Sequence, residues 1–237
     1  MKMLLLLLVA VVAISAPAFA AVVSNGDMTL GLAMLDQHPP VDGRVTSWHV
    51  YDLHGTQTDH STAYGVAATY TRWGQTMTAY SGNSAILANK GTHGSGGYFG
   101  IYQTVATTPG RSYTLSSMIN SMSNLTKSAT TQWGYYLFVV DGSGFTKPDD
   151  SLAYAYGRSN NMLDTGNTAG WVAKSKSFTA ASAYTTFAWL AYVDSDSAAS
   201  KGAFLGVDNV TITPEPGSML ALGTGLLGLV GFIRRKR

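Results

Sequence analysis

Short runs of alternating apolar and polar residues fill most of this chain between residues 21 and 213, separated by clusters of Gly, Asn, Asp and Ser. A period of two is typical of half-buried β-strands, and the intervening residues are those that accept tight turns. No segment in this range combines apolar residues at helical spacing with a capping residue in front. The pattern therefore predicts an all-β body.

The runs predict strands at 47–51, 64–72, 75–80, 84–88, 98–107, 112–119, 133–141, 152–156, 171–178, 184–193 and 204–213. Loops are expected at 89–97, 141–150, 157–170 and 194–202. Many short strands without helices between them, in a body of one domain's size, are typical of a two-sheet antiparallel β-sandwich. We expect the jelly-roll form of that sandwich for residues 21–213.

The N-terminal residues 1–20 have a different pattern. Lys2 is followed by an apolar run over 3–14 and by the small-residue site Ala18-Phe19-Ala20. These are the parts of a secretory signal peptide, so we expect export by the general secretion machinery and cleavage by a signal peptidase after Ala20. A permanent N-terminal anchor is the alternative, although the apolar run is short for a membrane span.

The C-terminal residues 214–237 have three parts in a fixed order. Two prolines bracket an acid, an uncharged Gly-rich stretch covers 217–233, and four cations close the chain; the residues at the two ends are Pro214, Glu215 and Pro216, and Arg234, Arg235, Lys236 and Arg237. The prolines hold the backbone extended around the carboxylate. As a helix the uncharged stretch is about 26 Å long, which is near the roughly 30 Å hydrocarbon core. We therefore expect one thin membrane crossing with its cationic end in the cytoplasm.

This order resembles the PEP-CTERM sorting signal of Gram-negative bacteria that make exopolysaccharide. In that family a membrane protease, an exosortase, recognises the tail and cuts it near the Pro-Glu-Pro motif, and the protein passes to the cell surface or beyond. The resemblance implies that residues 214–216 are a processing site for another protein. It also implies that 217–233 is a transient inner-membrane anchor and that 234–237 is its basic end. A plain C-terminal membrane anchor is the alternative.

Charge and composition change the picture of the body. Five of the chain's 15 Lys and Arg and one of its 13 acids lie in the two targeting segments, which leaves 10 cations against 12 acids, a net charge of −2. The whole-chain pI of 8.7 thus reflects the ends, and no basic stripe points to nucleic acid. The chain has no Cys, so an exported domain of this size depends on its core, without disulfides.

Three segments, at the start, middle and end of the body, occur together in one superfamily. They are Asn25-Gly26-Asp27-Met28, the run Gln103-Thr104-Val105 with Pro109 to Leu115 after it, and Asp208-Asn209-Val210. They resemble the carbohydrate-binding jelly rolls of the galactose-binding-like superfamily. The match departs at Met28, where an aromatic residue is usual, and at Thr29, where a Glu is usual. The resemblance implies a jelly-roll fold for residues 22–213.

Glycan recognition needs exposed aromatic rings that stack on the apolar face of a sugar. Aromatic residues at strand ends or beside Gly-rich loops are the candidates, and those we expect to bind are Trp73, Tyr98, Trp133 and Tyr135. Tyr51, Tyr80 and Trp171 belong to the wider set. Packing in the core or at a sheet edge is the alternative for each of them, and we expect Trp48 to be buried.

Two metal sites come into consideration. In the resembling fold an acid in the last strand helps to hold a structural Ca²⁺, so Asp208, with Asp27 and backbone carbonyls near Asn25, is the candidate set. The alternative for Asp208 is a carboxylate that lies at the surface or satisfies a turn. A zinc set is less expected in the cluster of His49, Asp52, His54, Asp59 and His60, because its spacing fits none of the usual zinc arrangements.

The sequence as a whole favours an exported, non-catalytic protein, sorted by an exosortase to the cell envelope, cell surface or extracellular matrix. We expect it to hold exopolysaccharide through aromatic residues in its loops. One alternative is a structural matrix protein that associates with copies of itself. A polysaccharide hydrolase is a further alternative, although Glu215 in the tail is the chain's only glutamate.

Overall fold

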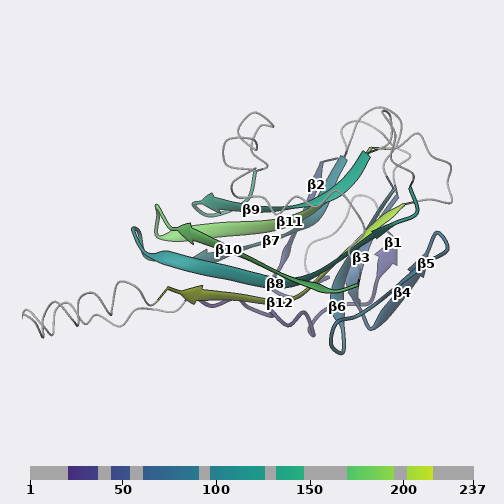
Figure 1. The fold of residues 1–237 in the computed structure, drawn as a ribbon, viewed down its shortest axis with the longest axis horizontal. Coiled ribbons are helices and arrows are strands. Elements are labelled where there is room, and N and C mark those ends of the chain that lie inside the picture. Colours follow the sequence, from purple (N-terminus) through teal and green to yellow (C-terminus); the bar gives the residue numbers. More distant parts are fainter. Residues whose placement is uncertain are drawn as a thin grey trace, which may run out of the picture.

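The computed structural model describes residues 21–36, 44–53, 61–90, 97–125, 132–146, 170–194 and 202–215. These residues form strands and turns, and Figure 1 shows two sheets lying face to face. This part of the chain holds no helix long and apolar enough to cross a membrane. The signal peptide expected at 1–20 and the membrane segment expected at 217–233 lie outside the described residues.

The larger sheet is six-stranded and antiparallel, with the order β1-β3-β6-β12-β8-β10. Its strands are β1 (Leu35–Asp36), β3 (Ser61–Ala67), β6 (Ser84–Lys90), β12 (Ala203–Pro214), β8 (Ser112–Ser123) and β10 (Val172–Thr179). The smaller sheet is four-stranded, with the order β2-β7-β11-β9. Its strands are β2 (His49–Leu53), β7 (Gly97–Ala106), β11 (Tyr184–Asp194) and β9 (Gln132–Asp141). A separate hairpin joins β4 (Thr69–Arg72) to β5 (Gln75–Thr78).

The chain crosses between the two sheets at every step from β6 to β12. The strands β6, β8, β10 and β12 belong to the larger sheet, and β7, β9 and β11 belong to the smaller one. This alternation is the connectivity of a jelly roll. The predicted all-β antiparallel sandwich is therefore confirmed.

Most strands coincide with the alternating runs of the sequence. The predicted strand at 64–72 is in fact two strands, because the chain bends at Ala68 and β4 leaves the sheet to form the hairpin. The two-residue strand β1 has too short a pattern to predict. The strand predicted at 152–156 lies outside the described residues.

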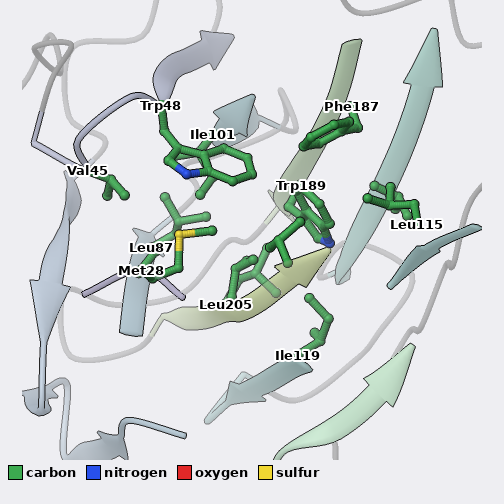
Figure 2. Packing of buried hydrophobic residues seen from close by; sticks show 14 of the residues in the cluster. Met28, Val45, Trp48, Leu87, Ile101, Leu115, Ile119, Phe187, Trp189 and Leu205 are labelled. Atoms are coloured by element: carbon green, nitrogen blue, oxygen red, sulfur yellow. The ribbon is translucent and has the colours of Figure 1, made fainter. Parts of the chain in front are cut away.

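The core fills the space between the inner faces of the two sheets (Figure 2). Trp48, which precedes β2, is 2% exposed, as expected, and its ring meets Phe187 and Trp189 of β11 edge to face at 5.8 and 5.6 Å between centroids. Leu87 and Leu205 approach from the larger sheet. Alternate residues of each strand enter this layer, so the remaining residues must face outward.

We predict that Trp48→Ala lowers the free energy of unfolding by about 3–5 kcal/mol, because it leaves a large cavity among close-packed rings. Urea unfolding followed by circular dichroism measures the change. Tyr184→Ala is the control, since Tyr184 is 52% exposed and should alter stability little. Equal stability of the two variants would contradict a core built around Trp48.

Candidate functional site

The outer face of the four-stranded sheet is covered with aromatic side chains. Each strand contributes residues at every second position, because the positions between them enter the core. We call this surface the aromatic face, and its rings belong to His49 and Tyr51 of β2, Tyr98 and Tyr102 of β7, Tyr136 and Phe138 of β9, Tyr192 of β11 and Phe145 of the segment after β9.

The strand register arranges these residues in rows across the sheet. One row runs from His49 through Tyr102 and Ala188 to Phe138. In the next row Gly100 lies opposite Leu190, and a Cβ at Gly100 would come within 2.4 Å of the Leu190 Cδ2 atom. Glycine at position 100 thus lets Leu190 fill the middle of the face. Ala188 and Leu190 are fully buried and form an apolar floor beneath the rings.

Three tyrosines from three strands gather at one end of the aromatic face. The ring centroids of Tyr98 and Tyr192 are 4.9 Å apart, and Tyr136 lies 5.5 Å from Tyr98 and 6.4 Å from Tyr192. All three side chains are partly exposed. They provide ring faces for stacking and phenolic hydroxyls for hydrogen bonds at one place.

Phe145 covers the other part of the face. Its ring lies 4.9 Å from Tyr51, 5.7 Å from Tyr102 and 5.9 Å from Phe138, and it is 9% exposed. Two threonines hold the backbone before it, since Gly144 N donates to Thr104 Oγ1 at 3.1 Å and Thr186 Oγ1 donates to Gly142 O at 2.9 Å. The segment is therefore fastened over the sheet, and Phe145 closes off that part of the face.

The residues expected to bind glycan are distributed over three places. Tyr98 lies on the aromatic face. Tyr135 is 1% exposed in the core, so its assignment as a sugar-stacking ring is wrong; its neighbour Tyr136 faces outward because strand residues alternate. Trp133 is in β9 opposite Val193, and its side chain lies outside what the structure describes.

Trp73 lies on the other sheet, away from the aromatic face. It sits in the turn between β4 and β5, and this hairpin packs on the outer side of β3, β6 and β12. Its indole lies over Gly202, where a Cβ would come within 2.3 Å of the ring, and the Arg72 guanidinium is 4.5 Å from its centroid. Asn124 Nδ2 donates to Trp73 O at 2.7 Å. The ring is thus used to attach the hairpin to the sheet.

Prediction from strand ends missed Tyr102, Tyr136 and Tyr192. The sequence feature that could identify them is the alternation of strand residues between two faces. Tyr98 and Tyr102 are an even number of positions apart and share one face of β7, whereas Tyr192 is an odd number of positions from the buried Trp189 and lies on the opposite face of β11. This assignment could be made from the sequence only by first deciding which set is buried. Both sets contain aromatic residues, so hydrophobicity alone does not separate them.

Two residues of the proposed zinc set, His49 and Asp52, lie among the described residues. His49 stacks on Tyr102 with 5.1 Å between ring centroids, within the aromatic face. Among the described residues, no group of three or more His, Cys, Asp or Glu side chains is placed to hold a metal. His54, Asp59 and His60 lie outside the described residues.

A second polar site surrounds Asp208 in β12. Asp208 is 1% exposed, Ser84 Oγ donates to its Oδ2 at 2.6 Å, and Asn209 N donates to its Oδ1 at 2.6 Å. The register of β12 against β8 shifts just after it, between Asp208 and Thr211. Burial raises the pKa of Asp208 above its ordinary value of 3.8, the hydrogen bonds oppose this, and the charge of Asp27 adds to the rise.

The predicted calcium ligands lie partly together. The charge of Asp27 contributes to the raised pKa of Asp208. Val210 N donates to Gly26 O at 2.6 Å, which places the turn at residues 24–27 against the part of β12 where its register shifts. A desolvated carboxylate beside a second acid is an arrangement that a hard cation stabilises. The carbonyl of Asn25 is engaged, because it accepts from Trp48 Nε1 at 3.2 Å and from Met28 N at 3.2 Å. The two carboxylates therefore remain as the candidate ligands.

The end of the body leads directly into the predicted processing site. Pro214 is the last residue of β12, opposite Tyr113 of β8, and Glu215 follows it. Pro216 and the basic end, 234–237, lie outside the described residues. A family model described as the PEP-CTERM protein-sorting motif matches residues 213–237. The chain ends in a PEP-CTERM sorting motif. This motif implies an exported, envelope-associated protein that an exosortase processes.

Solved structures with a similar arrangement share little sequence with this chain. The enzymatically active domain of tailspike protein 4 of bacteriophage CBA120 is 15% identical, with a TM-score of 0.43, over 83% of this chain and 22% of the tailspike chain. TmCBM61 in complex with β-1,4-galactotriose is 11% identical, with a TM-score of 0.38, over 72% of this chain and 90% of the module.

The family 11 carbohydrate-binding module of a cellulosomal cellulase of Clostridium thermocellum is 12% identical, with a TM-score of 0.37, over 78% of this chain and 96% of the module. This chain spans about a fifth of the tailspike chain. No curated protein matches the chain significantly. At such TM-scores these likenesses carry no argument about function, which must come from the chain's own residues.

We predict that Asp208 makes stability fall as the pH rises. The folded state holds the Asp208 proton to a higher pH than the unfolded state does, because burial raises the pKa. Its contribution is therefore present below about pH 4, the range of an ordinary Asp pKa, and is lost as the pH passes through the raised pKa. Thermal unfolding of the wild type and Asp208→Asn, with a chelator present, should show the wild type losing stability relative to the variant. Parallel pH profiles would contradict it.

Proposed function

We propose that this protein is an exported, non-catalytic glycan-binding protein that holds exopolysaccharide on its aromatic face. The observation that carries the proposal is the group formed by Tyr98, Tyr136 and Tyr192, three partly exposed rings within 6.4 Å of one another. Tyrosine stacks on the apolar side of a sugar, and its hydroxyl hydrogen-bonds to sugar hydroxyls. The sorting motif supports the proposal because it brings the domain to the envelope.

The chemistry of the face favours a neutral glycan. Its described side chains are tyrosine, phenylalanine, aliphatic and hydroxyl groups, with His49 at the β2 edge. Such a surface binds through stacking and neutral hydrogen bonds. Ion pairs with acidic sugars need cations, and Lys174 and Lys176 are on β10 of the other sheet.

The hydrolase alternative requires two carboxyl groups about 5–10 Å apart on the substrate side. The chain's only glutamate, Glu215, is at the end of β12 in the other sheet. Asp52 of β2 lies opposite Phe99, a core residue, and so has the parity of the inner face. Neither of these two described carboxyl groups lies on the aromatic face, which favours the binding proposal over the hydrolase alternative for this part of the chain.

Self-association through paired sheet edges is a further alternative. The edge strand β10 alternates partly buried and exposed residues, and the partly buried set is Val172, Lys174, Lys176 and Phe178. Inward-pointing lysines on an edge strand disfavour pairing with another strand. The structure of this edge therefore favours the glycan hypothesis over a fibre built by edge pairing.

We further propose that after export residues 217–233 anchor the chain in the inner membrane until an exosortase removes the tail. The protein then remains at the cell surface or in the extracellular matrix. The physical support is the order of the tail: an uncharged stretch of membrane-spanning length is followed by four cations that resist translocation.

The glycan proposal predicts that Tyr136→Ala and Tyr192→Ala each weaken binding to the host exopolysaccharide roughly two- to tenfold, the worth of one aromatic contact. Affinity electrophoresis of the folded variants in gels containing the polysaccharide measures the change. Tyr80→Ala is the matched control, because Tyr80 is a 47% exposed tyrosine that packs on Trp171 outside the aromatic face. Absence of wild-type binding, or equal loss in the control, would contradict the proposal.

We also propose that Ca²⁺ binds between Asp27 and Asp208. At a calcium concentration about 100 times the dissociation constant, binding should stabilise the wild type by about 2.7 kcal/mol. Differential scanning calorimetry with calcium or chelator measures this, with Asp27→Asn and Asp208→Asn expected to lose the response. Asp141→Asn is the control, since Asp141 belongs to β9 and accepts from Ala181 N at 2.9 Å. A calcium response equal in all variants, or none in the wild type, rules the site out.

A further inference from the structure

The sorting motif begins within the β-sheet of the folded body. Thr213 lies opposite Thr114 of β8, Pro214 lies opposite Tyr113, and the pairing continues one residue further. Glu215 N donates to Ser112 O at 3.0 Å, so the first two residues of the Pro-Glu-Pro motif follow the line of β12 along β8. Proline has no N–H to donate, so Pro214 adds no such bond, and Glu215 supplies the last backbone hydrogen bond between β12 and β8 that the structure describes.

The Glu215 side chain is held as well as its backbone. Thr114 Oγ1 donates to Glu215 Oε1 at 3.0 Å, and Thr114 Oγ1 is also 2.9 Å from Ser177 Oγ of β10. An ionised carboxylate only accepts hydrogen bonds, so Thr114 gives its single proton to Glu215. Ser177 must then donate to Thr114. The carboxylate is the end of a chain of hydroxyls that crosses three strands.

A protease that reads this motif needs the backbone of Glu215 free. Proteolytic cleavage concentrates in segments that are exposed and not hydrogen-bonded, and proteases bind extended peptides through main-chain hydrogen bonds. Here the Glu215 N–H is already given to Ser112 O, and the side chain, which is partly buried, is already bound to Thr114.

We propose that β8 holds the sorting motif closed, with Thr114 as the positioning residue that sets how often Glu215 is released to the sorting protease. The inference rests on the proposed function of residues 214–216 as a processing site. Release requires the last residues of β12 to separate from β8, which is a local opening that leaves the rest of the sheet intact. When such opening is fast, the rate of cleavage follows the population of the open form.

The first test is amide hydrogen exchange in the full chain, purified in detergent micelles. In Thr114→Val the Glu215 amide should exchange about fivefold faster than in the wild type, the ratio that corresponds to about 1 kcal/mol for one hydrogen bond. Ser116→Ala is the matched control, because Ser116 is also a partly buried hydroxyl residue on the same face of β8 but lies opposite Thr211. Thr114→Ser keeps the hydroxyl and should restore the wild-type rate. Equal exchange in Thr114→Val and the wild type overturns the proposal.

The second test is the rate of tail removal in the host, followed by pulse labelling and mass spectrometry of the C-terminus. Thr114→Val should be processed about fivefold faster than the wild type and Ser116→Ala at the wild-type rate, by the same single-bond ratio. Equal rates in all three mean that the motif is read before β12 pairs with β8, which overturns the proposal. A wild type that keeps Arg237 overturns the sorting assignment itself, so the two failures are distinct.

A disulfide variant tests in a single protein whether pairing of β12 with β8 slows processing. Thr213 and Thr114 are directly opposed, and cross-strand pairs have Cα separations that a disulfide accepts. The double variant Thr213→Cys, Thr114→Cys should therefore be processed more slowly than the wild type when oxidised. When reduced it lacks the Thr114 hydroxyl and should be processed faster than the wild type. Oxidised protein processed at the wild-type rate or faster contradicts closure of the motif by β8.

Discussion

Side chains alternate between the two faces of a strand, and both the core and the aromatic face of this protein follow from that alternation. In β11, Phe187 and Trp189 pack against Trp48 between the sheets, and this packing determines how the strand is rotated. Leu190 and Tyr192 must then point outward. A slip of one residue would exchange the two sets, so the core packing that stabilises the sandwich also builds the aromatic face.

The outer faces of the two sheets are covered by different residues. The β4–β5 hairpin covers the larger sheet, with Met77 close above Gly206 and Trp73 above Gly202. Trp171, which directly precedes β10, also packs on Gly206. The smaller sheet instead carries partly exposed tyrosines over a buried floor of aliphatic residues. Trp73 and Trp171 therefore pack against the larger sheet, whereas Tyr98, Tyr136 and Tyr192 on the smaller sheet remain partly exposed.

The body and its sorting signal are joined through a single strand. β12 supplies Leu205 and Val207 to the core, Asp208 to the buried polar site, and the residues that lead into Glu215. β8 pairs with both parts of β12, in one register up to Asp208 and in a shifted register from Thr211 onward. The bulge after Asp208 lies between the core segment and the segment that precedes the sorting motif.

Local sequence was enough to predict most strand positions, the burial of Trp48 and the sorting motif, which the family model matches at residues 213–237. These follow from periodicity and from linear motifs, which depend on neighbours along the chain. The three-dimensional fold was needed to show that Tyr136 rather than Tyr135 faces outward, that Trp73 packs on Gly202, and that Thr114 donates a hydrogen bond to Glu215. The reason is that strand parity, sheet order and register join residues far apart in sequence, and both faces of these strands carry aromatic side chains.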